Sequence, residues 1–514
     1  MASTTATPTI SAVLIVKDEE DVLEASLAAL GWVDEIIVYD TGSTDSTRDL
    51  AGRHTPHVIE GYWDDDFGAA RNRALEHATS EWALIVDADE IFEGDTAHLL
   101  RRLAADEANL FLVAVETVDG DTPRPEGPNV TARIFRRSEY RYAGRLHEQV
   151  VPIDPSTRPV LEPVLHVCIK HSGYTDAAIA KHDKRARNLT IAQRDLDEAL
   201  ARETPPVMLD ILRTNLARAL GMAGEHEASL ALATVVRTNG VVPAVGLTDL
   251  AVSAVGSALA LELDDVVDEW LTVWQHADSS PVWARATRVR ILAGRGDLQG
   301  ALDLLDQLPT TSVDSSGRRF HKHELSGIAV SALAATGRRR AAARAARESA
   351  LAGYASVGPT ILSRIFVQAD RLDSYIRDLP DQVWREHAVW CVHEATPDSI
   401  AFLMAMAAVR PDDLTVLLCL AKIAPSLGLE DLAVSAAALR RVGLAEHCPL
   451  VTVSRSGDVE PQLRAIASAM AVGIYEDDRA VPGLEAALAA VAPQDEAELL
   501  RQLEIVTPGL VTAS

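Results

Sequence analysis

The amino-acid sequence predicts two structural classes in one chain, an α/β domain first and an all-α helical-repeat region after it. The first third of the chain alternates short apolar runs, which predict buried strands, with stretches whose apolar residues recur at helical spacing. From about residue 176 the strand pattern fades, and paired helical stretches joined by short turns replace it. The length of 514 residues agrees with this division, because single cores of that size are rare.

The expected elements of the α/β domain follow one another closely. Strands are predicted at residues 10–16, 35–39, 58–59 and 82–86, and helices at residues 19–30, 43–51 and 67–78. Because two parallel strands need a crossover between them, this alternation predicts βαβ units and a mostly parallel sheet. Later apolar runs at residues 110–118, 130–135 and 164–169 have no long helix between them, so we expect them to extend the sheet.

Four helical hairpins are predicted in the second part of the chain. Their turns are expected at residues 223–225, 294–297, 336–338 and 427–429. The spacing is irregular but close to the roughly 34 to 40 residues of helical-hairpin repeats, so the region resembles a degenerate tetratricopeptide-like array.

Pro205-Pro206 is expected to mark the junction between the two parts, because proline ends the preceding helix. The predicted organisation is a disordered N-terminus at 1–9, an α/β domain at 10–204 and a repeat region at 205–514. The pattern leaves open whether the repeats form one or two subdomains.

Composition and charge indicate which binding partners and which cellular compartment to expect. The formal net charge is −27, and such a field would repel a nucleic-acid backbone. The four cysteines form no CxxC pair, which predicts free thiols in a reducing compartment. The first residues lack the basic and apolar segments of a signal peptide, and no run is long enough for a membrane span. We therefore expect a cytoplasmic protein with no nucleic-acid partner and no membrane span.

Carboxylates follow two of the predicted strands. Asp87 and Asp89 come directly after the strand at 82–86, and Asp40 follows the strand at 35–39. Ligands of open α/β sheets bind at the carboxyl ends of strands. A pair of carboxylates there suits Mg²⁺ or Mn²⁺ held together with substrate phosphates. A lone DxD sequence also occurs in solvated acidic turns, and Ser43 or Thr44 after Asp40 also fits a capped turn before a helix.

A third polar segment opens the helix predicted at 67–78. Its aspartates, Asp64-Asp65-Asp66, suit a helix N-terminus through the helix dipole alone. Arg71, farther along the same helix, offers a planar donor fork that suits a phosphate or the edge of a base.

Together these segments resemble the family 2 glycosyltransferases, which have the GT-A fold, a Rossmann-like α/β fold. The matching sequences are LIVKDEE at 14–20, DEIIVYDTGSTDST at 34–47, DDFGAARNRAL at 65–75 and WALIVDADE at 82–90. TARIFRR at 131–137, YAGRLHEQV at 142–150 and HSGYT at 171–175 resemble the later catalytic signatures of a subgroup, the peptide glycosyltransferases of glycocin biosynthesis. The chain is thus expected to be a GT-A catalytic domain followed by tetratricopeptide-like repeats.

The resemblance implies a metal-dependent, inverting transfer of a hexose or N-acetylhexosamine from a nucleotide-diphosphate sugar, by family habit a UDP-sugar, with Mn²⁺ or Mg²⁺ as cofactor. It implies that one set of residues binds the nucleotide sugar, namely Asp40, Arg71, Asp87 and Arg145. Asp89 and His171 are the implied metal ligands. Glu148 is the implied general base with His147 beside it, although the base varies in position within the family.

Plainer roles compete for the later residues. His147 also fits a buried, hydrogen-bonded histidine, and Glu148 a simple ion pair with Arg145. His171 also fits a turn residue, and Arg136-Arg137 fits solvated charges on an edge strand.

The repeat region predicts a macromolecular acceptor, because concave solenoid surfaces bind extended chains. We expect the acceptor to be a peptide or protein, and a saccharide or cell-surface precursor is the second hypothesis for the acceptor. A helical-repeat scaffold with an inactive α/β domain is the alternative from another class, and the sequence leaves a homodimer open. A nucleotidyltransferase would need a Gly-rich basic phosphate loop after the first strand, whereas that loop is Lys17-Asp18-Glu19-Glu20.

Overall fold

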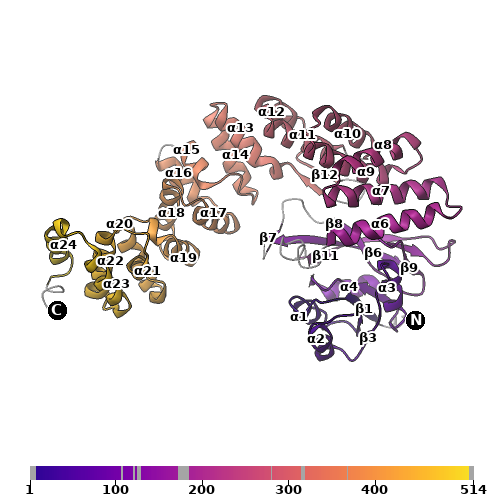
Figure 1. Ribbon diagram of the computed structural model, residues 1–514, viewed down its shortest axis with the longest axis horizontal. Helices are drawn as coiled ribbons and strands as arrows, with labels where there is room; N and C mark the ends of the chain where they lie inside the picture. The colour runs from indigo at the N-terminus through magenta and orange to yellow at the C-terminus, as the bar shows by residue number, and fades with distance from the viewer. Residues whose placement is uncertain are drawn as a thin grey trace, which may run out of the picture. The chain divides into compact units, whose positions relative to one another are not determined.

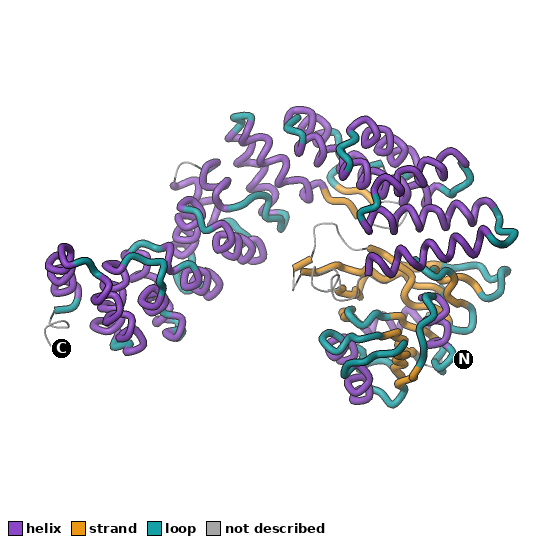
Figure 2. The backbone as a smooth tube through the Cα atoms, in the orientation of Figure 1, coloured by secondary structure: helices purple, strands orange, loops and turns teal. Residues whose placement is uncertain are grey.

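The computed structural model describes residues 7–105, 108–119, 122–123, 129–171, 184–278, 281–313, 319–366 and 369–508. An α/β domain comes first in the chain and helices follow it, as the sequence predicts (Figures 1 and 2). Residues 1–6 of the N-terminus predicted to be disordered, and residues 172–175 of the HSGYT segment, lie outside the described residues.

The α/β domain is built on one mixed sheet with the strand order β3-β2-β1-β4-β8-β6-β11-β5, and β7 pairs with β6. Its strands are β1 (Ile10–Val16), β2 (Glu35–Asp40), β3 (Val58–Glu60), β4 (Trp82–Ile85), β5 (Glu90–Gly94), β6 (Leu110–Asp119), β7 (Thr122–Pro123), β8 (Asn129–Arg136) and β11 (Leu161–His171). The first four strands are parallel, whereas β8 runs antiparallel to both β4 and β6. The later apolar runs therefore extend the sheet, as predicted.

Helices cover the two faces of this sheet. They are α1 (Leu23–Ala28), α2 (Thr47–His54), α3 (Phe67–Leu75) and α4 (Thr96–Ala104). Alternate residues of β1 face opposite ways: Leu14 belongs to a core with α1, α2 and α4, and Val13 to a core with α3. A separate pair of strands, β9 (Tyr140–Ala143) and β10 (Gln149–Pro152), lies against α3 through Tyr140 and Tyr142. The sheet is thus buried on both sides, as parallel strands require.

Some local expectations were wrong. The helix expected at 43–51 begins only at Thr47, because Ser43 uses its Oγ to accept a hydrogen bond from the Asp18 N–H rather than to cap a helix. β5 and α4 were not predicted at all. β5 begins at Glu90, inside the acidic segment, and α4 is an amphipathic helix that buries Leu99 and Leu103.

Contacts between Cα atoms divide the chain into two compact units, residues 1–288 with 308–321 and residues 289–307 with 322–514. The first unit holds the α/β domain and the helices α6 (Lys184–Leu200), α7 (Pro206–Ala223), α8 (His226–Asn239), α9 (Ala244–Ala260) and α10 (Asp264–Ala277), together with the strands β12 (Thr311–Val313) and β13 (Arg319–His321). Helix α11 (Val282–Gly294) contains the boundary.

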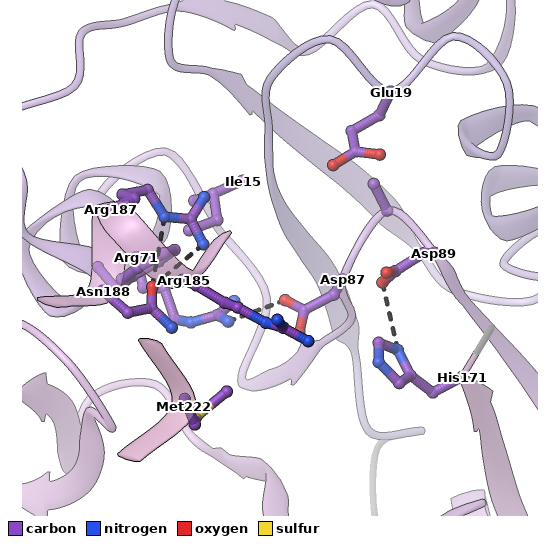
Figure 3. A pocket seen from close by; sticks show the side chains of 12 residues that line it. Ile15, Glu19, Arg71, Asp87, Asp89, His171, Arg185, Arg187, Asn188 and Met222 are labelled. Atoms are coloured by element: carbon purple, nitrogen blue, oxygen red, sulfur yellow. Dashed lines mark hydrogen bonds and ion pairs between the residues drawn. The ribbon is translucent and has the colours of Figure 1, made fainter. Parts of the chain in front are cut away.

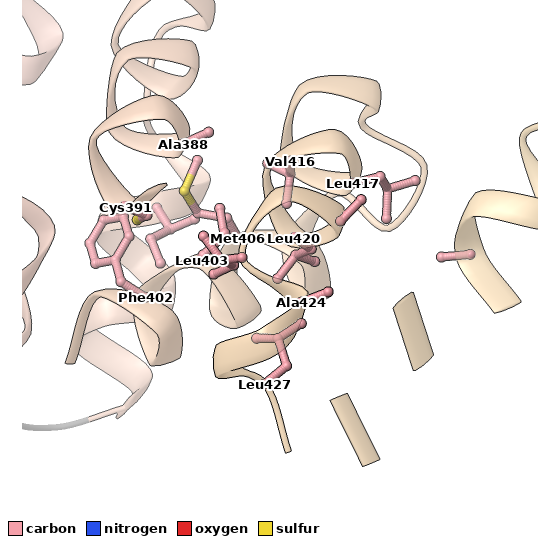
Figure 4. Packing of buried hydrophobic residues seen from close by; sticks show 14 of the residues in the cluster. Ala388, Cys391, Phe402, Leu403, Met406, Val416, Leu417, Leu420, Ala424 and Leu427 are labelled. Carbon is pink, nitrogen blue, oxygen red and sulfur yellow. The ribbon is translucent and has the colours of Figure 1, made fainter. Parts of the chain in front are cut away.

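The second unit is helical. Its elements are α12 (Leu298–Asp306), η1 (Lys322–Leu325), α13 (Ser326–Ala335), α14 (Arg339–Leu351), α15 (Pro359–Ile365), α16 (Ala369–Arg377), α17 (Asp381–Glu394), α18 (Pro397–Val409), α19 (Leu414–Lys422), η2 (Ala424–Ser426), α20 (Leu429–Arg441), η3 (Ala445–His447), α21 (Pro449–Arg455), α22 (Pro461–Tyr475), η4 (Asp478–Ala480), α23 (Val481–Ala490) and α24 (Pro493–Val506). Figure 4 shows part of its core, where Leu403 and Met406 of α18 pack beside Leu420 of α19.

Two helices joined by a short turn are present at each of the four predicted positions. In three of them a glycine ends the first helix with a positive φ, 88° at Gly224, 83° at Gly296 and 77° at Gly337. The residue after each glycine donates its N–H to a carbonyl five residues back, which closes the helix end. The fourth turn differs, because Gly428 has a φ of −70° and stands at the N-cap of α20.

Helices α6 and α7 share a core with the α/β domain. Ile191 and Leu196 of α6 and Leu216 of α7 are buried together with Leu146 from the loop between β9 and β10, and Phe67 of α3 packs against them. Leu146 therefore anchors the β9–β10 loop in the apolar core formed with α6 and α7. The predicted boundaries at residues 9, 204 and 205 stay predictions.

The start of α3 touches the same loop at Gly68. A Cβ atom at this position would lie 2.5 Å from the carbonyl oxygen of Gly144. We predict that Gly68→Ala lowers the free energy of unfolding of the first unit by about 1–3 kcal/mol, because backbone must move to admit the methyl group. Gly52→Ala in α2 is the control, because its Cβ would meet nothing within 4 Å and should leave stability unchanged or higher. Urea unfolding of both variants is the measurement, and equal stabilities would contradict the close contact.

Candidate functional site

The loops that follow β1 and β2 are joined by hydrogen bonds. The Asp18 carboxylate accepts from the N–H of Thr44 at 2.7 Å, and the Glu19 N–H donates to Thr47 Oγ1 at 2.8 Å. Asp18 has a φ of 55°, which turns the chain between these contacts. The polar residues of the first two motifs therefore hold the loop after β1 and the loop after β2 together at the carboxyl edge of the sheet.

Asp40 lies at this edge, fully buried at the end of β2. Its Oδ1 accepts the N–H groups of Gly42 at 2.9 Å and Ser43 at 2.8 Å. Its Oδ2 is buried and has no hydrogen-bond partner among the described residues. A buried acceptor of this kind is costly, so its unused capacity requires an explanation.

Asp87 and Asp89 leave the sheet at the same edge as Asp40. Asp40 pairs with Val16 on β1, and β1 also pairs in parallel with β4, whose end precedes Asp87. Only β1 separates the two carboxylate-bearing strands. The segments therefore converge on one edge of the sheet, as the sequence predicts.

The third motif anchors α3 to the β9–β10 hairpin. Asp66 caps the helix by accepting the Ala69 N–H at 2.7 Å. Asn72 exchanges two hydrogen bonds with the backbone of Tyr142, at 2.8 and 2.9 Å. These contacts hold the helix against the hairpin and determine where Arg71 points.

Arg71 is buried and links two segments that are distant in sequence. Its Nη2 donates to Asp87 Oδ1 at 2.8 Å and its Nε donates to Glu148 Oε1 at 2.7 Å. Burial alone would lower the pKa of this guanidinium, but Asp87 and Glu148 outweigh it and raise the pKa well above its usual value. Burial alone would likewise raise the pKa of Asp87, but Arg71 and Arg133 hold it well below the usual range. Asp87 is thus a carboxylate at neutral pH.

A second buried ion pair, between Arg133 and Glu90, stabilises the turn that carries Asp87 and Asp89. Arg133 of β8 donates to Glu90 Oε1 at 2.6 Å, and Glu90 Oε2 accepts the N–H of Asp87 at 2.8 Å. Glu90 is 1% exposed. This contact fixes the backbone from which Asp87 and Asp89 project.

A pocket of about 400 Å³ opens beside these residues (Figure 3). Asp87, Asp89 and His171 line it together with Arg71, and the Nδ1 atom of His171 lies 3.3 Å from Asp89 Oδ1. The remaining lining residues are Ile15, Glu19, Phe67, Ala88, Arg185, Arg187, Asn188 and Met222. Figure 3 shows the Asp89–His171 pair and the α6 residues Arg187 and Asn188 at opposite ends of the view.

The other predicted site residues lie outside this pocket lining. Asp40 is buried at the same edge, and Glu148 accepts a hydrogen bond from Arg71. Arg145 pairs with Glu198 of α6 at 2.6 Å, and His147 is exposed with a φ of 56°. Their predicted roles in catalysis and donor binding stay predictions.

The plainer roles considered for these residues are mostly wrong. Glu148 pairs with Arg71 rather than Arg145. His147 is exposed to solvent by surface area, although partial burial of its ring lowers its pKa to about 4. His171 ends a long strand instead of lying in a turn. Arg136 is not on an edge strand, since β8 lies between β4 and β6. Its guanidinium stacks on the Trp82 ring at 4.6 Å.

The residues that sequence reasoning missed come mainly from helices beyond the α/β domain. Arg185, Arg187 and Asn188 stand at the start of α6, and Met222 near the end of α7. The basic sequence at 184–187, Lys-Arg-Ala-Arg, was the available signal. Within the described ranges, no cluster of three or more His, Cys, Asp or Glu side chains could hold a metal ion.

Residues 11–159 match the family model described as glycosyl transferase family 2. The α/β domain is a family 2 glycosyltransferase domain with the GT-A fold. This glycosyltransferase domain is 40% identical over 146 residues to a TPR repeat-containing protein of Synechococcus elongatus, a match that covers 27% of this chain and 35% of the relative. It is 27% identical over 194 residues to the SPbeta prophage-derived glycosyltransferase SunS of Bacillus subtilis, covering 37% of this chain and 46% of the relative.

These matches span about a third to a half of the length of the two curated relatives. The match to SunS supports the subgroup resemblance that the motifs indicate, and the match to the TPR repeat-containing protein agrees with the helical repeats. Among solved structures, S. aureus TarS is similar at 14% identity with a TM-score of 0.28, over 52% of this chain and 55% of that one. Among the described helices, none combines the length and apolar content needed to cross a membrane.

We predict that Arg71→Met lowers the free energy of unfolding by about 3 kcal/mol or more, because two carboxylates in contact with its guanidinium lose their partner. Arg48→Met is the matched control, because Arg48 pairs with Glu60 in solvent and such a pair contributes about 1 kcal/mol at most. Chemical unfolding at pH 7 measures both. A loss for Arg71→Met no larger than that of the control would contradict the linking role.

Proposed function

We propose that the chain is an inverting glycosyltransferase that transfers a hexose or N-acetylhexosamine from a UDP-sugar to a peptide or protein acceptor. The observation that carries this proposal is the pocket at the carboxyl edge of a family 2 domain, lined by Asp87, Asp89 and His171. Binding sites of open α/β sheets occur at this edge. The volume of about 400 Å³ lies in the range of small-molecule pockets.

Asp89 and His171 are the proposed ligands of Mn²⁺ or Mg²⁺. A carboxylate oxygen and an imidazole nitrogen 3.3 Å apart, facing one pocket, are a donor set that fits Mn²⁺. Two protein ligands suffice for such ions in nucleotide sites, because diphosphate oxygens and water complete the shell. When bound, the ion would stabilise the charge that grows on the departing diphosphate.

The chain's own residues are proposed to orient the donor and activate the acceptor. Asp87, kept ionised by Arg71, is proposed to accept a hydrogen bond from the ribose. Glu148 is the proposed base, and its bond to Arg71 fixes one carboxylate oxygen. Arg71 therefore couples the group that holds the donor to the group that deprotonates the acceptor.

The acceptor is proposed to be a peptide or protein. The support is the series of helical hairpins after the catalytic domain, because arrays of this type bind extended chains. The resemblance of the motifs to the glycocin subgroup points the same way.

We predict that the wild-type protein releases UDP from UDP-glucose or UDP-N-acetylglucosamine in the presence of Mn²⁺. Asp89→Asn should lower this turnover about 100-fold or more and remove the Mn²⁺-dependent increase in melting temperature with UDP. Glu148→Gln should lower turnover while UDP still raises the melting temperature.

The matched control is Glu93→Gln, the same charge change farther along β5, in an exposed pair with Lys170. It should leave turnover and UDP binding unchanged. If no nucleotide stabilises the wild-type protein, the enzyme assignment is wrong and the inactive-scaffold alternative gains support.

A separate prediction concerns the base and rests on the unpartnered Oδ2 of Asp40. Asp40→Asn keeps an oxygen for the two backbone N–H groups and replaces the other acceptor by an NH₂ donor. We expect UDP affinity to fall roughly tenfold, because the N–H of uracil loses its acceptor, and affinity for CDP to rise relative to UDP. Calorimetric titration of both nucleotides is the measurement. Unchanged affinities would assign Asp40 to the loop structure alone.

A further inference from the structure

The charges that line the pocket are unequally compensated. Arg71 is neutralised by Asp87 and Glu148, and Asp89 is next to His171. Arg185 and Arg187 of α6 make no ion pair with any carboxylate of the described residues, although the Glu19 carboxylate acts on Arg187 from a greater distance. Arg71, Asp87, Asp89 and His171 of the same lining are paired, so these two guanidinium groups are the ones positioned for an anionic ligand.

Packing holds Arg187 at the pocket, whereas Arg185 is exposed at the pocket lining. The Arg187 guanidinium lies 5.0 Å from the centre of the Phe67 ring, and its Nε and Nη2 are 3.4 Å from Asn188 Oδ1. Farther along α6, Ile191 and Leu196 are buried against Leu146 of the catalytic domain. Helix α6 is therefore attached to the domain on its apolar side, while its first turns face the pocket.

Electrostatic contacts hold α6 in the same position. Glu198 accepts from Arg145 at 2.6 Å, and Asp195 lies 3.7 Å from the Nε of the same arginine. Burial of the Arg187 side chain lowers its pKa, with Glu19 opposing the change, so a nearby anion would relieve part of the cost of holding the charge there.

We propose that Arg187 and Arg185 bind the diphosphate of the nucleotide-sugar donor, so that α6, the first described helix after the matched family segment, forms part of the donor site. This inference rests on the proposed function. A diphosphate carries at least two negative charges and would lie beside Asp87 and Asp89, so it needs cations that those carboxylates have not already neutralised. Figure 3 shows Asp89 and His171 across the pocket from Arg187, which leaves the diphosphate between a metal-binding side and an arginine side.

The test compares UDP with uridine, which lacks both phosphates, on the full chain in Mn²⁺. Arg187→Gln and Arg185→Gln are expected to weaken UDP binding by roughly tenfold or more and uridine binding by less than about twofold. Inorganic pyrophosphate is expected to lose affinity together with UDP. Arg187→Lys should recover part of the loss, because it keeps the charge without the planar fork.

Arg194→Gln is the matched control on the same helix. Arg194 is half exposed, pairs with Glu198 and Asp65, and lies outside the pocket lining. Equal weakening of UDP and uridine by the Arg187 and Arg185 variants, or equal weakening of UDP by the Arg194 control, would overturn the diphosphate role. Unchanged UDP binding in both pocket variants would also overturn it, while UDP binding by the wild type would leave the proposed function standing. Absence of any nucleotide binding by the folded wild type would instead refute the proposed function.

Discussion

The arrangement of the site depends on one buried guanidinium. Arg71 stands on α3 and holds the carboxylate after β4 and the carboxylate after β9 at the same time. An isolated charge in this position would be expensive, so the three groups stabilise one another only as a set. Two further contacts orient the arginine: the cap at Asp66 and the double hydrogen bond between Asn72 and Tyr142. The third motif, at residues 65–75, therefore connects the turn at Asp87 and Asp89 to the β9–β10 hairpin through Arg71.

The same linkage extends to the helices that follow. The loop that carries Glu148 also carries Leu146, buried in the core of α6 and α7, and Arg145, paired with α6. A glycine at position 68 lets α3 approach the loop closely enough for Arg71 to reach Glu148. The family 2 domain and the helices α6 and α7 are consequently one packing unit, which explains how α6 comes to line the pocket.

The division of charge in the pocket gives its two ends different chemistry. Glu90 accepts the backbone N–H of Asp87, and Arg71 donates to the Asp87 carboxylate, so Asp87 is held in place and ionised. Asp89 keeps a different neighbour, His171, which arrives on the last residue of β11. The α6 end is cationic. The proposed donor, a nucleotide-diphosphate sugar, is anionic in the middle and binds a divalent cation, so it would suit both ends.

Much of this architecture follows from the sequence. Strand β1, the parallel strands around it and the hairpin turns at Gly224 and Gly296 are determined by local apolar spacing and by glycine at positive φ. The convergence of Asp40, Asp87 and Asp89 follows from the rule that parallel strands present their carboxyl ends together.

Only the tertiary structure decided the partners of the charged side chains. Arg71 and Glu148 are 77 residues apart, and nothing local distinguishes that pairing from one between Glu148 and the nearby Arg145. The outcome depends on which helix face packs against the hairpin, a long-range property of the core. The same reason explains why the sequence did not place the basic start of α6 in the site: only the packing of Ile191 and Leu196 brings Arg185 and Arg187 to the pocket.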